Sequence, residues 1–133
     1  MLTEQVIADG SLRAEDDGFS FDLRMPWYRA LPLSCLEGLE VRIDGEPMRS
    51  EELRLSLDGR TYALADLPPL HDTWWYVADP ADVRVPKPEG LPPGEHELDV
   101  TIALRIPYIV ESGHPLVMRE RCVKTLATKG GSR

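Results

Sequence analysis

The stretch His96 to Ile106, HELDVTIALRI, has the most regular alternation of apolar and polar residues in the sequence. Side chains two residues apart lie on the same face of a β-strand. The apolar face of this strand would carry Leu98, Val100, Ile102, Leu104 and Ile106. The opposite face would carry Glu97, Asp99, Thr101 and Arg105. One apolar and one polar face is typical of an antiparallel sheet with one solvated side.

The same alternation recurs in shorter segments on the N-terminal side of this strand. Four such segments are 19–25, 39–43, 53–57 and 83–85. Two of them are followed by Asp-Gly pairs, Asp44-Gly45 and Asp58-Gly59, which are typical of tight hairpin turns. After the segment SGHP at 112–115, we expect residues 116–128 to return as a last strand.

Proline and glycine interrupt the sequence at roughly strand-length intervals, with twelve prolines and ten glycines in 133 residues. No segment keeps a helical apolar period for three turns, and only one helical turn is expected near 47–53, with Ser50 as its cap. We therefore predict an all-β single domain, an antiparallel β-sandwich of the immunoglobulin-like or jelly-roll-like kind, over residues 1–128. The segment KGGSR at 129–133 is expected to be a flexible basic tail.

Composition excludes several classes of function. A net charge of -8 argues against nucleic-acid binding, which requires a basic face. No apolar run approaches the roughly 20 residues of a membrane-spanning helix, and no membrane contact is expected. The N-terminal segment lacks the basic and apolar regions of a secretory signal, so the expected location is the cytoplasm. Cys35 and Cys122 would there be reduced thiols.

A self-sufficient catalytic set is missing from the sequence. The histidines His71, His96 and His114 are scattered and form no metal-binding motif. His71 and Asp72 could supply two metal ligands or be an exposed turn, and His96 is expected at the rim of the core or within it. Cys35 is either a reactive thiol or, as the better interpretation, a small buried apolar residue. No G-x-S-x-G nucleophile motif occurs.

Two aromatic clusters indicate recognition rather than catalysis. The segment RMPWYRALPLS at 24–34 contains Trp27, Tyr28 and Arg29, residue types that are enriched at binding hot spots. Its prolines exclude it from the interior of a sheet. In the second cluster, WWY at 74–76, adjacent side chains must point to opposite faces of a strand. At least one large ring would therefore face outward, where another protein, a sugar or a neighbouring loop would cover it.

The first cluster and the residues after it resemble the small β subunits of bacterial C-glycoside deglycosidases. The family pattern RPYYRGLPLS followed by EVxVDGE corresponds here to RMPWYRALPLS at 24–34 and EVRIDGE at 40–46. Similar features occur in RLSLDGRTYALADL, near Trp75 and in LPPGEHELDVTIALRIPY. The resemblance spans from about Ser11 to Leu126. The departures are Trp27 for a tyrosine, Ala30 for a glycine and the additional SGHP.

The resemblance implies a subunit of a heteromeric carbon–carbon lyase that is not catalytic alone. The catalytic α subunit, similar to sugar-phosphate isomerase barrels, would carry the base and a divalent metal, usually Mn²⁺, and this chain would carry no cofactor. The substrate would be a 3-keto C-glycoside with an aromatic aglycone such as a flavonoid or an anthraquinone.

The resemblance further implies that the segment 24–34 docks on the α subunit near the mouth of its active site. The expected interface residues are Pro26, Trp27, Tyr28, Arg29, Leu31, Pro32, Leu33, Trp75 and His114. Two rival hypotheses remain. One is a stand-alone carbohydrate-binding sandwich that stacks sugars on Trp74, Trp75 and Tyr76, and the other is an independent enzyme with a metal site at His71 and Asp72.

Overall fold

The computed structural model of the chain describes residues 5–128, and the tail expected at 129–133 lies outside the described residues. The described part contains eleven β-strands: β1 (Arg13–Glu15), β2 (Gly18–Leu23), β3 (Leu31–Pro32), β4 (Leu36–Ile43), β5 (Glu46–Pro47), β6 (Arg54–Leu57), β7 (Arg60–Ala63), β8 (Trp74–Trp75), β9 (Ala81–Pro86), β10 (Glu95–Glu111) and β11 (His114–Ala127). Three single 3₁₀ turns connect them: η2 (Leu33–Cys35), η3 (Ser50–Glu52) and η4 (Leu64–Asp66). No helix in this part of the chain is long and apolar enough to cross a membrane.

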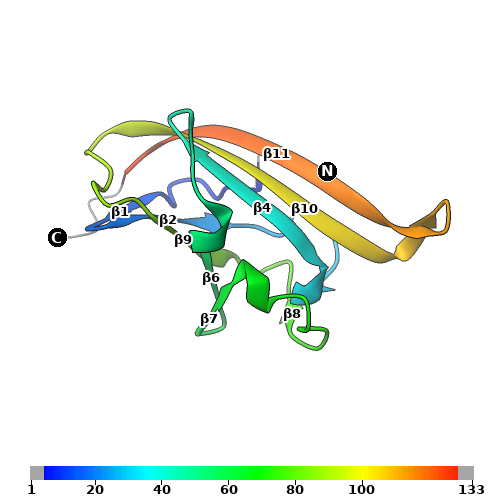
Figure 1. Cartoon of the computed structure of the whole chain (residues 1–133). Helices are drawn as coiled ribbons and strands as arrows, with labels where there is room; N and C mark the ends of the chain where they lie inside the picture. The colour runs from blue at the N-terminus through cyan, green and yellow to red at the C-terminus, as the bar shows by residue number, and fades with distance from the viewer. Residues whose placement is uncertain (1–4, 129–133) are drawn as a thin grey trace.

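The strands form two antiparallel sheets that pack face to face (Figure 1). One sheet has the strand order β1-β2-β9-β6-β7, and the other has the order β11-β10-β4-β5. The short strands β3 and β8 pair separately as a two-stranded ribbon. The prediction of an all-β antiparallel sandwich in one domain is confirmed.

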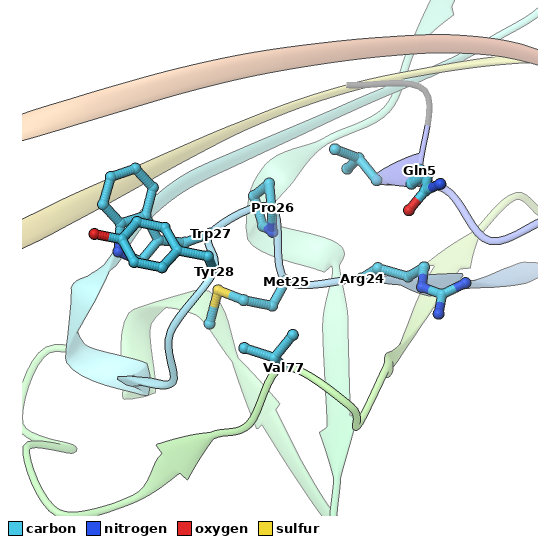
Figure 2. A pocket seen from close by; sticks show the side chains of 8 residues that line it. Gln5, Arg24, Met25, Pro26, Trp27, Tyr28 and Val77 are labelled. Atoms are coloured by element: carbon cyan, nitrogen blue, oxygen red, sulfur yellow. The ribbon is translucent and has the colours of Figure 1, made fainter. Parts of the chain in front are cut away.

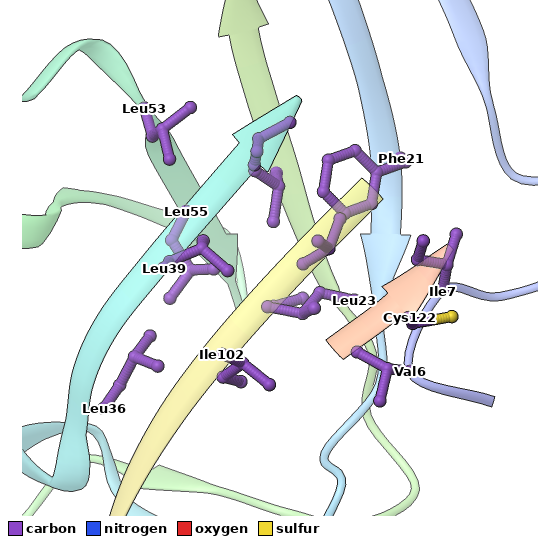
Figure 3. Close-up of a cluster of buried hydrophobic side chains, with 14 of the residues drawn as sticks. Val6, Ile7, Phe21, Leu23, Leu36, Leu39, Leu53, Leu55, Ile102 and Cys122 are labelled. Atoms are coloured by element: carbon purple, nitrogen blue, oxygen red, sulfur yellow. The ribbon is translucent and has the colours of Figure 1, made fainter. Parts of the chain in front are cut away.

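The core lies between the two sheets and contains the apolar faces that alternation predicts. Figure 3 shows Phe21 and Leu23 of β2 close to Ile102 of β10 and Leu39 of β4, and all four side chains are buried. Burying a side chain of this size contributes about 1.5–3 kcal/mol relative to an exposed one. The polar side chains of β10 and β4 lie on the outer face of their sheet, where Arg121 of β11 donates two hydrogen bonds to Asp99.

Both predicted Asp-Gly turns are present. The φ angles are positive at Asp44 and Gly45 (50° and 83°) and at Asp58 and Gly59 (55° and 77°), as a tight hairpin turn with the twist of the flanking strands requires. The single helical turn near residue 50 is also present, but Ser50 is not its cap. The Ser50 hydroxyl instead donates to the carbonyl of Leu39 on the neighbouring strand β4.

The hairpin of β10 and β11 is longer than the sheet to which it belongs. Strand β4 pairs with β10 only as far as Leu104, opposite Leu36. The two hairpin strands continue to Glu111 and His114, and the register shifts between Ile106 and Val110. The end of the hairpin therefore extends past β4 at one end of the sandwich (Figure 1).

Candidate functional site

The loop of residues 24–30 is fixed at both ends by the backbone. The amide of Arg24 donates to the carbonyl of Val6 over 2.7 Å, and the amide of Leu33 donates to the carbonyl of Thr73 over 2.8 Å. Just after the loop, Leu31 pairs with Trp75 between β3 and β8. These contacts fix the backbone at both ends of the loop, which lies at the end of the sandwich.

The loop contacts Tyr108, near the end of the long hairpin, through Trp27 and Arg29. The indole N–H of Trp27 donates to the hydroxyl of Tyr108, with 2.5 Å between the two atoms. The guanidinium carbon of Arg29 lies 5.4 Å from the centre of the Tyr108 ring, within the range of a cation–π contact. The rings of Trp27 and Tyr28 are 4.8 Å apart and tilted by 42°. We call Trp27, Tyr28, Arg29 and Tyr108 the aromatic end.

Tyr108 is the member of the aromatic end that sequence reasoning missed. It follows the regular alternation of 96–106 and lies within the register shift of β10. That shift turns its ring toward the loop, so alternation alone could not assign its direction. The adjacent Pro107 was the one local signal that the regular pairing ends there.

The predicted interface residues divide into exposed and buried groups. Tyr28, Arg29 and His114 are exposed, and Trp27 and Pro32 are half-buried. The remaining four, Pro26, Leu31, Leu33 and Trp75, are buried within this chain.

These four residues are buried within the isolated chain, and their contact with a partner stays a prediction. Trp75 is 1% exposed, and its indole N–H donates to the carbonyl of Asp79 over 2.8 Å. Its neighbours Trp74 and Tyr76 are 44% and 53% exposed. The prediction that the WWY cluster cannot lie wholly in the core is confirmed, and the inward member is Trp75.

A pocket of about 350 Å³ lies beside the aromatic end. It is lined by Gln5, Val6, Arg24, Met25, Pro26, Trp27, Tyr28 and Val77. Figure 2 shows Trp27 and Tyr28 at one end, Arg24 and Gln5 at the other, and Met25 and Val77 between them. The pocket is thus apolar and aromatic along most of its length and cationic at one end.

Exposed apolar side chains concentrate on the segments that surround this pocket. Among the described residues, the large ones are Tyr28, Trp74, Tyr76, Val77, Tyr108, Val110, Val117 and Val123. All except Val123 lie on the loop, on the segment 74–77 or on the outer part of the long hairpin. Clusters of exposed apolar residues mark sites of interaction with other molecules.

A second, more polar pocket of about 330 Å³ contains Ser34, His71 and Arg105 among its lining residues. Arg105 forms an ion pair with Glu37 and also contacts the sulfur of Cys35 at 3.9 Å. Burial raises the pKa of the Cys35 thiol, although the charge of Arg105 acts in the opposite direction. The interpretation of Cys35 as a small buried residue is confirmed, and its protonated thiol is a poor nucleophile.

The alternative hypothesis of a metal site at His71 and Asp72 would need a third ligand, and none is placed beside them among the described residues. Both side chains are exposed, and within residues 5–128 no group of three His, Cys, Asp or Glu side chains is arranged to hold a metal ion. His96 is buried at the rim of the core, as predicted. Its Nδ1 lies 2.6 Å from a carboxylate oxygen of Asp44, and its Nε2 lies 2.8 Å from the carbonyl oxygen of Pro92.

Comparison with known proteins identifies the family. The family model of the C-glycoside deglycosidase beta subunit matches residues 1–108. The 3'-dehydrocarminate deglycosidase beta subunit of a Microbacterium species is 40% identical over 129 residues, which are 97% of this chain and of that protein. C-glycoside deglycosidase beta subunits of Microbacterium trichothecenolyticum and Arthrobacter globiformis are 35% and 32% identical, over 95% of this chain and 96% of each relative. The chain therefore belongs to the family of C-glycoside deglycosidase beta subunits.

Proposed function

We propose that this chain binds a catalytic α subunit through its aromatic end, and that the complex cleaves the carbon–carbon bond of a 3-keto C-glycoside. Family membership supports the role of a subunit in such an enzyme. The name of one relative gives its substrate as 3'-dehydrocarminate, which supports an oxidised C-glycoside as the substrate. The observation that carries the proposal is the exposed group of Tyr28, Arg29 and Tyr108. Arg29 contacts the ring of Tyr108 directly, and Tyr28 is joined to it through Trp27.

The reaction that we propose is a redox-neutral elimination. The ketone at C3 of the sugar makes the proton at C2 acidic, and a general base removes that proton. The bond between C1 and the aglycone then breaks, a double bond forms between C1 and C2, and the electron pair of the broken bond goes to the aglycone carbon. That carbon takes up a proton. The aglycone must accept an electron pair, so an electron-accepting aromatic ring suits it.

The base and the metal belong, in this proposal, to an α subunit with an isomerase-like barrel. A bound divalent ion, Mn²⁺ in the usual case, would supply positive charge for the developing enolate oxygen. The described residues of the present chain offer no group of three ligands for such an ion, so in this proposal the α subunit would hold it. The buried thiols of Cys35 and Cys122 are unpaired, which supports a complex in the reducing cytoplasm.

The proposed role of this chain is to bind the α subunit beside its active site. Tyr28 is 69% exposed and offers an apolar ring, while Arg29 keeps an exposed guanidinium for a carboxylate of the partner. His114 lies at the turn of the long hairpin and extends the same end of the sandwich. A contact formed by these residues would leave the core unchanged.

Co-expression with the α subunit encoded by a neighbouring gene tests the proposal. Size exclusion should show a stable complex, and cleavage of a 3-keto C-glycoside should require both chains. The double variant Tyr28→Ala/Arg29→Ala should weaken the complex, whereas Arg60→Ala, at the exposed start of β7 in the other sheet, should leave it intact. An α subunit that is fully active alone and does not bind this chain would overturn the proposal.

A second candidate, a stand-alone carbohydrate-binding domain, is favoured by the two exposed rings Trp74 and Tyr76. Burial removes Trp75 from the stacking platform, which leaves the exposed rings of Trp74 in β8 and of Tyr76 directly after it. Titration of the isolated chain with monosaccharides and oligosaccharides, followed by tryptophan fluorescence, tests this candidate. Binding that is lost in Trp74→Ala would support it, and the absence of any sugar binding would exclude it.

A further inference from the structure

We propose that the pocket between Arg24 and the rings of Trp27 and Tyr28 binds a planar aromatic ligand that carries an anionic group. We further infer that in the assembled enzyme this ligand is the aglycone part of the substrate. The second statement rests on the proposed function, whereas the first concerns this chain alone.

The size of the pocket suits an aromatic group rather than a whole glycoside. Its volume of about 350 Å³ lies at the lower end of the range of about 300–1,000 Å³ found for ligand pockets. The lining combines an apolar floor, made by Met25 and Val77, with the rings of Trp27 and Tyr28. Aromatic rings favour stacked or edge-on contact with other aromatic rings, and a thioether is also a favourable neighbour of a ring.

The aromatic wall is held in place before a ligand arrives. The Trp27 indole N–H is bound to the Tyr108 hydroxyl, and the Tyr108 ring is covered by the Arg29 guanidinium. A side chain that is already ordered loses less conformational entropy when a ligand binds. The backbone beneath it is also fixed, because the amide of Arg24 is bound to the carbonyl of Val6.

The charge of the pocket favours an anion. Among the described residues, Arg24 is the one charged residue that lines the pocket, and no carboxylate of these residues does. Within residues 5–128, Arg24 has no side-chain hydrogen bond or ion pair. The carboxylate of Asp9 is bound by the ammonium group of Lys124 over 2.9 Å, and the charge of Arg24 adds only the smallest contribution to its lowered pKa. A guanidinium that has no hydrogen-bonded carboxylate among the described residues, at one end of an apolar pocket, fits a carboxylate or sulfonate attached to a ring.

The second pocket does not offer the same chemistry. Its cation, Arg105, is already neutralised by Glu37, which lines the same pocket. The unpaired charge and the aromatic wall therefore occur together only at the first of these two pockets.

Binding to the full-length chain tests the first statement. The probe is 2-naphthoate, and its neutral control is 2-naphthalenemethanol, which has the same rings. Calorimetric titration should show that the anion binds about tenfold tighter or more, as expected for a charge-assisted hydrogen bond. Arg24→Gln should remove this preference while the neutral compound binds as before. Equal affinity of the wild-type chain for both compounds would overturn the proposal.

Filling the pocket provides an independent test. Val77 is 45% exposed, so Val77→Trp can place an indole in the pocket with little effect on the core. This variant should lose binding of both compounds. Val123→Trp, at a similarly exposed site on β11, and Arg60→Gln should bind them like the wild type. Undiminished binding in a folded Val77→Trp variant would assign the compounds to another site and contradict the proposal.

The role in the enzyme is tested in the complex with the α subunit. Arg24→Gln should lower kcat/KM about tenfold for a 3-keto C-glycoside with a carboxylated aglycone, and leave it unchanged for the uncharged counterpart. Size exclusion should show unchanged assembly. If assembly is normal but both substrates respond alike, the pocket does not hold the aglycone. If the wild-type chains do not assemble, the proposed function fails, while the naphthoate titration still decides the first statement.

Discussion

The side chains of Trp27 and Tyr108 are joined by a hydrogen bond over 2.5 Å although they lie 81 positions apart in the chain. Trp27 belongs to the loop before β3, and Tyr108 belongs to the part of β10 that extends past β4. The bond therefore connects a loop to the end of a hairpin that β4 does not support. Because Arg29 also contacts the Tyr108 ring, this one residue orders both the docking surface and the pocket wall.

The first prediction concerns the hydroxyl of Tyr108. Tyr108→Phe keeps the ring but leaves the Trp27 indole without its acceptor, so the free energy of unfolding should fall by about 0.5–1 kcal/mol. The value is modest because the site is exposed and water can replace the hydroxyl. Urea unfolding measures it. Tyr76→Phe is the matched control, since Tyr76 is similarly exposed and no hydrogen bond of its hydroxyl occurs among the described residues. Equal losses in the two variants would contradict the prediction.

Alternation of apolar residues was sufficient to predict the strands β2, β4, β6, β9 and β10 and their buried faces. Alternation does not predict whether Trp74 or Trp75 of the short strand β8 faces the core, because this depends on the pairing of Leu31 with Trp75. The loop prolines indicated correctly that 24–34 does not lie inside a large sheet. They gave no sign that Leu31 and Leu33 would be buried.

The pocket was beyond prediction for a different reason. Val6, Met25 and Val77 come from three separate segments, and no local pattern records that they meet. The position of Arg24 beside them follows from the hydrogen bond between its amide and Val6, which is a tertiary contact. The hypothesis of a WWY stacking platform fails for Trp75 because its ring is buried. Alternation requires that adjacent members face opposite sides, but it does not say which of them faces inward.

The second prediction is a pH dependence of stability at His96. Burial lowers the pKa of this imidazole, but the hydrogen bonds to Asp44 and to the Pro92 carbonyl, together with the charge of Asp44, raise it more. The hydrogen bond from His96 in turn lowers the pKa of Asp44. Both partners of His96 accept hydrogen bonds, so the folded state favours the doubly protonated ring.

The direction of the effect follows from these shifts. The folded chain holds the His96 proton more tightly than the unfolded chain, whose pKa is near 6.5. The stabilisation is fully present below pH 6.5 and is lost as the pH rises through the raised pKa of the folded state. On the acid side, the Asp44 contribution is lost as the pH falls through its lowered pKa, below the ordinary value of 3.8.

Unfolding of the wild type and of His96→Gln between pH 4 and pH 9 measures this dependence. The difference in the free energy of unfolding should be largest at about pH 5–6 and should shrink at alkaline pH. His114→Gln is the control, because it removes an exposed histidine that is remote from the pair of His96 and Asp44. A constant difference for His96→Gln across the range would show that the charged ring contributes nothing.

The third prediction concerns the close approach of two strands at Gly18. Gly18 pairs with Pro86 between β2 and β9, and a Cβ atom at this position would lie 2.1 Å from the carbonyl oxygen of Val85. Gly18→Ala should therefore force the backbones apart and lower the free energy of unfolding by about 2–3 kcal/mol.

Gly38 of β4 provides the control, because a Cβ atom there would meet the Ala103 side chain at an ordinary distance of 3.7 Å. Gly38→Ala should be neutral or stabilising by about 0.4–1 kcal/mol. Thermal unfolding of both variants measures these effects. A Gly18→Ala variant as stable as the wild type would show that the two strands can separate there without cost.

The fourth prediction separates the end of the long hairpin from its outer face. Val110 lies two residues beyond Tyr108 and is 63% exposed, and Val123 lies further along β11 and is 48% exposed. Because both are on the surface, Val110→Asp and Val123→Asp should each change the free energy of unfolding by no more than about 0.5 kcal/mol.

Their effects on assembly with the α subunit should differ. If the hairpin end docks on the α subunit, Val110→Asp places a charge in a desolvated contact and should weaken the complex about tenfold or more. Val123→Asp should leave the affinity unchanged, because Val123 lies on the face that carries the exposed cations Arg119 and Arg121. Biolayer interferometry with immobilised α subunit measures both affinities. Loss of binding in Val123→Asp alone would move the contact to the charged outer face of β11, and the aromatic end would then have to serve the ligand pocket only.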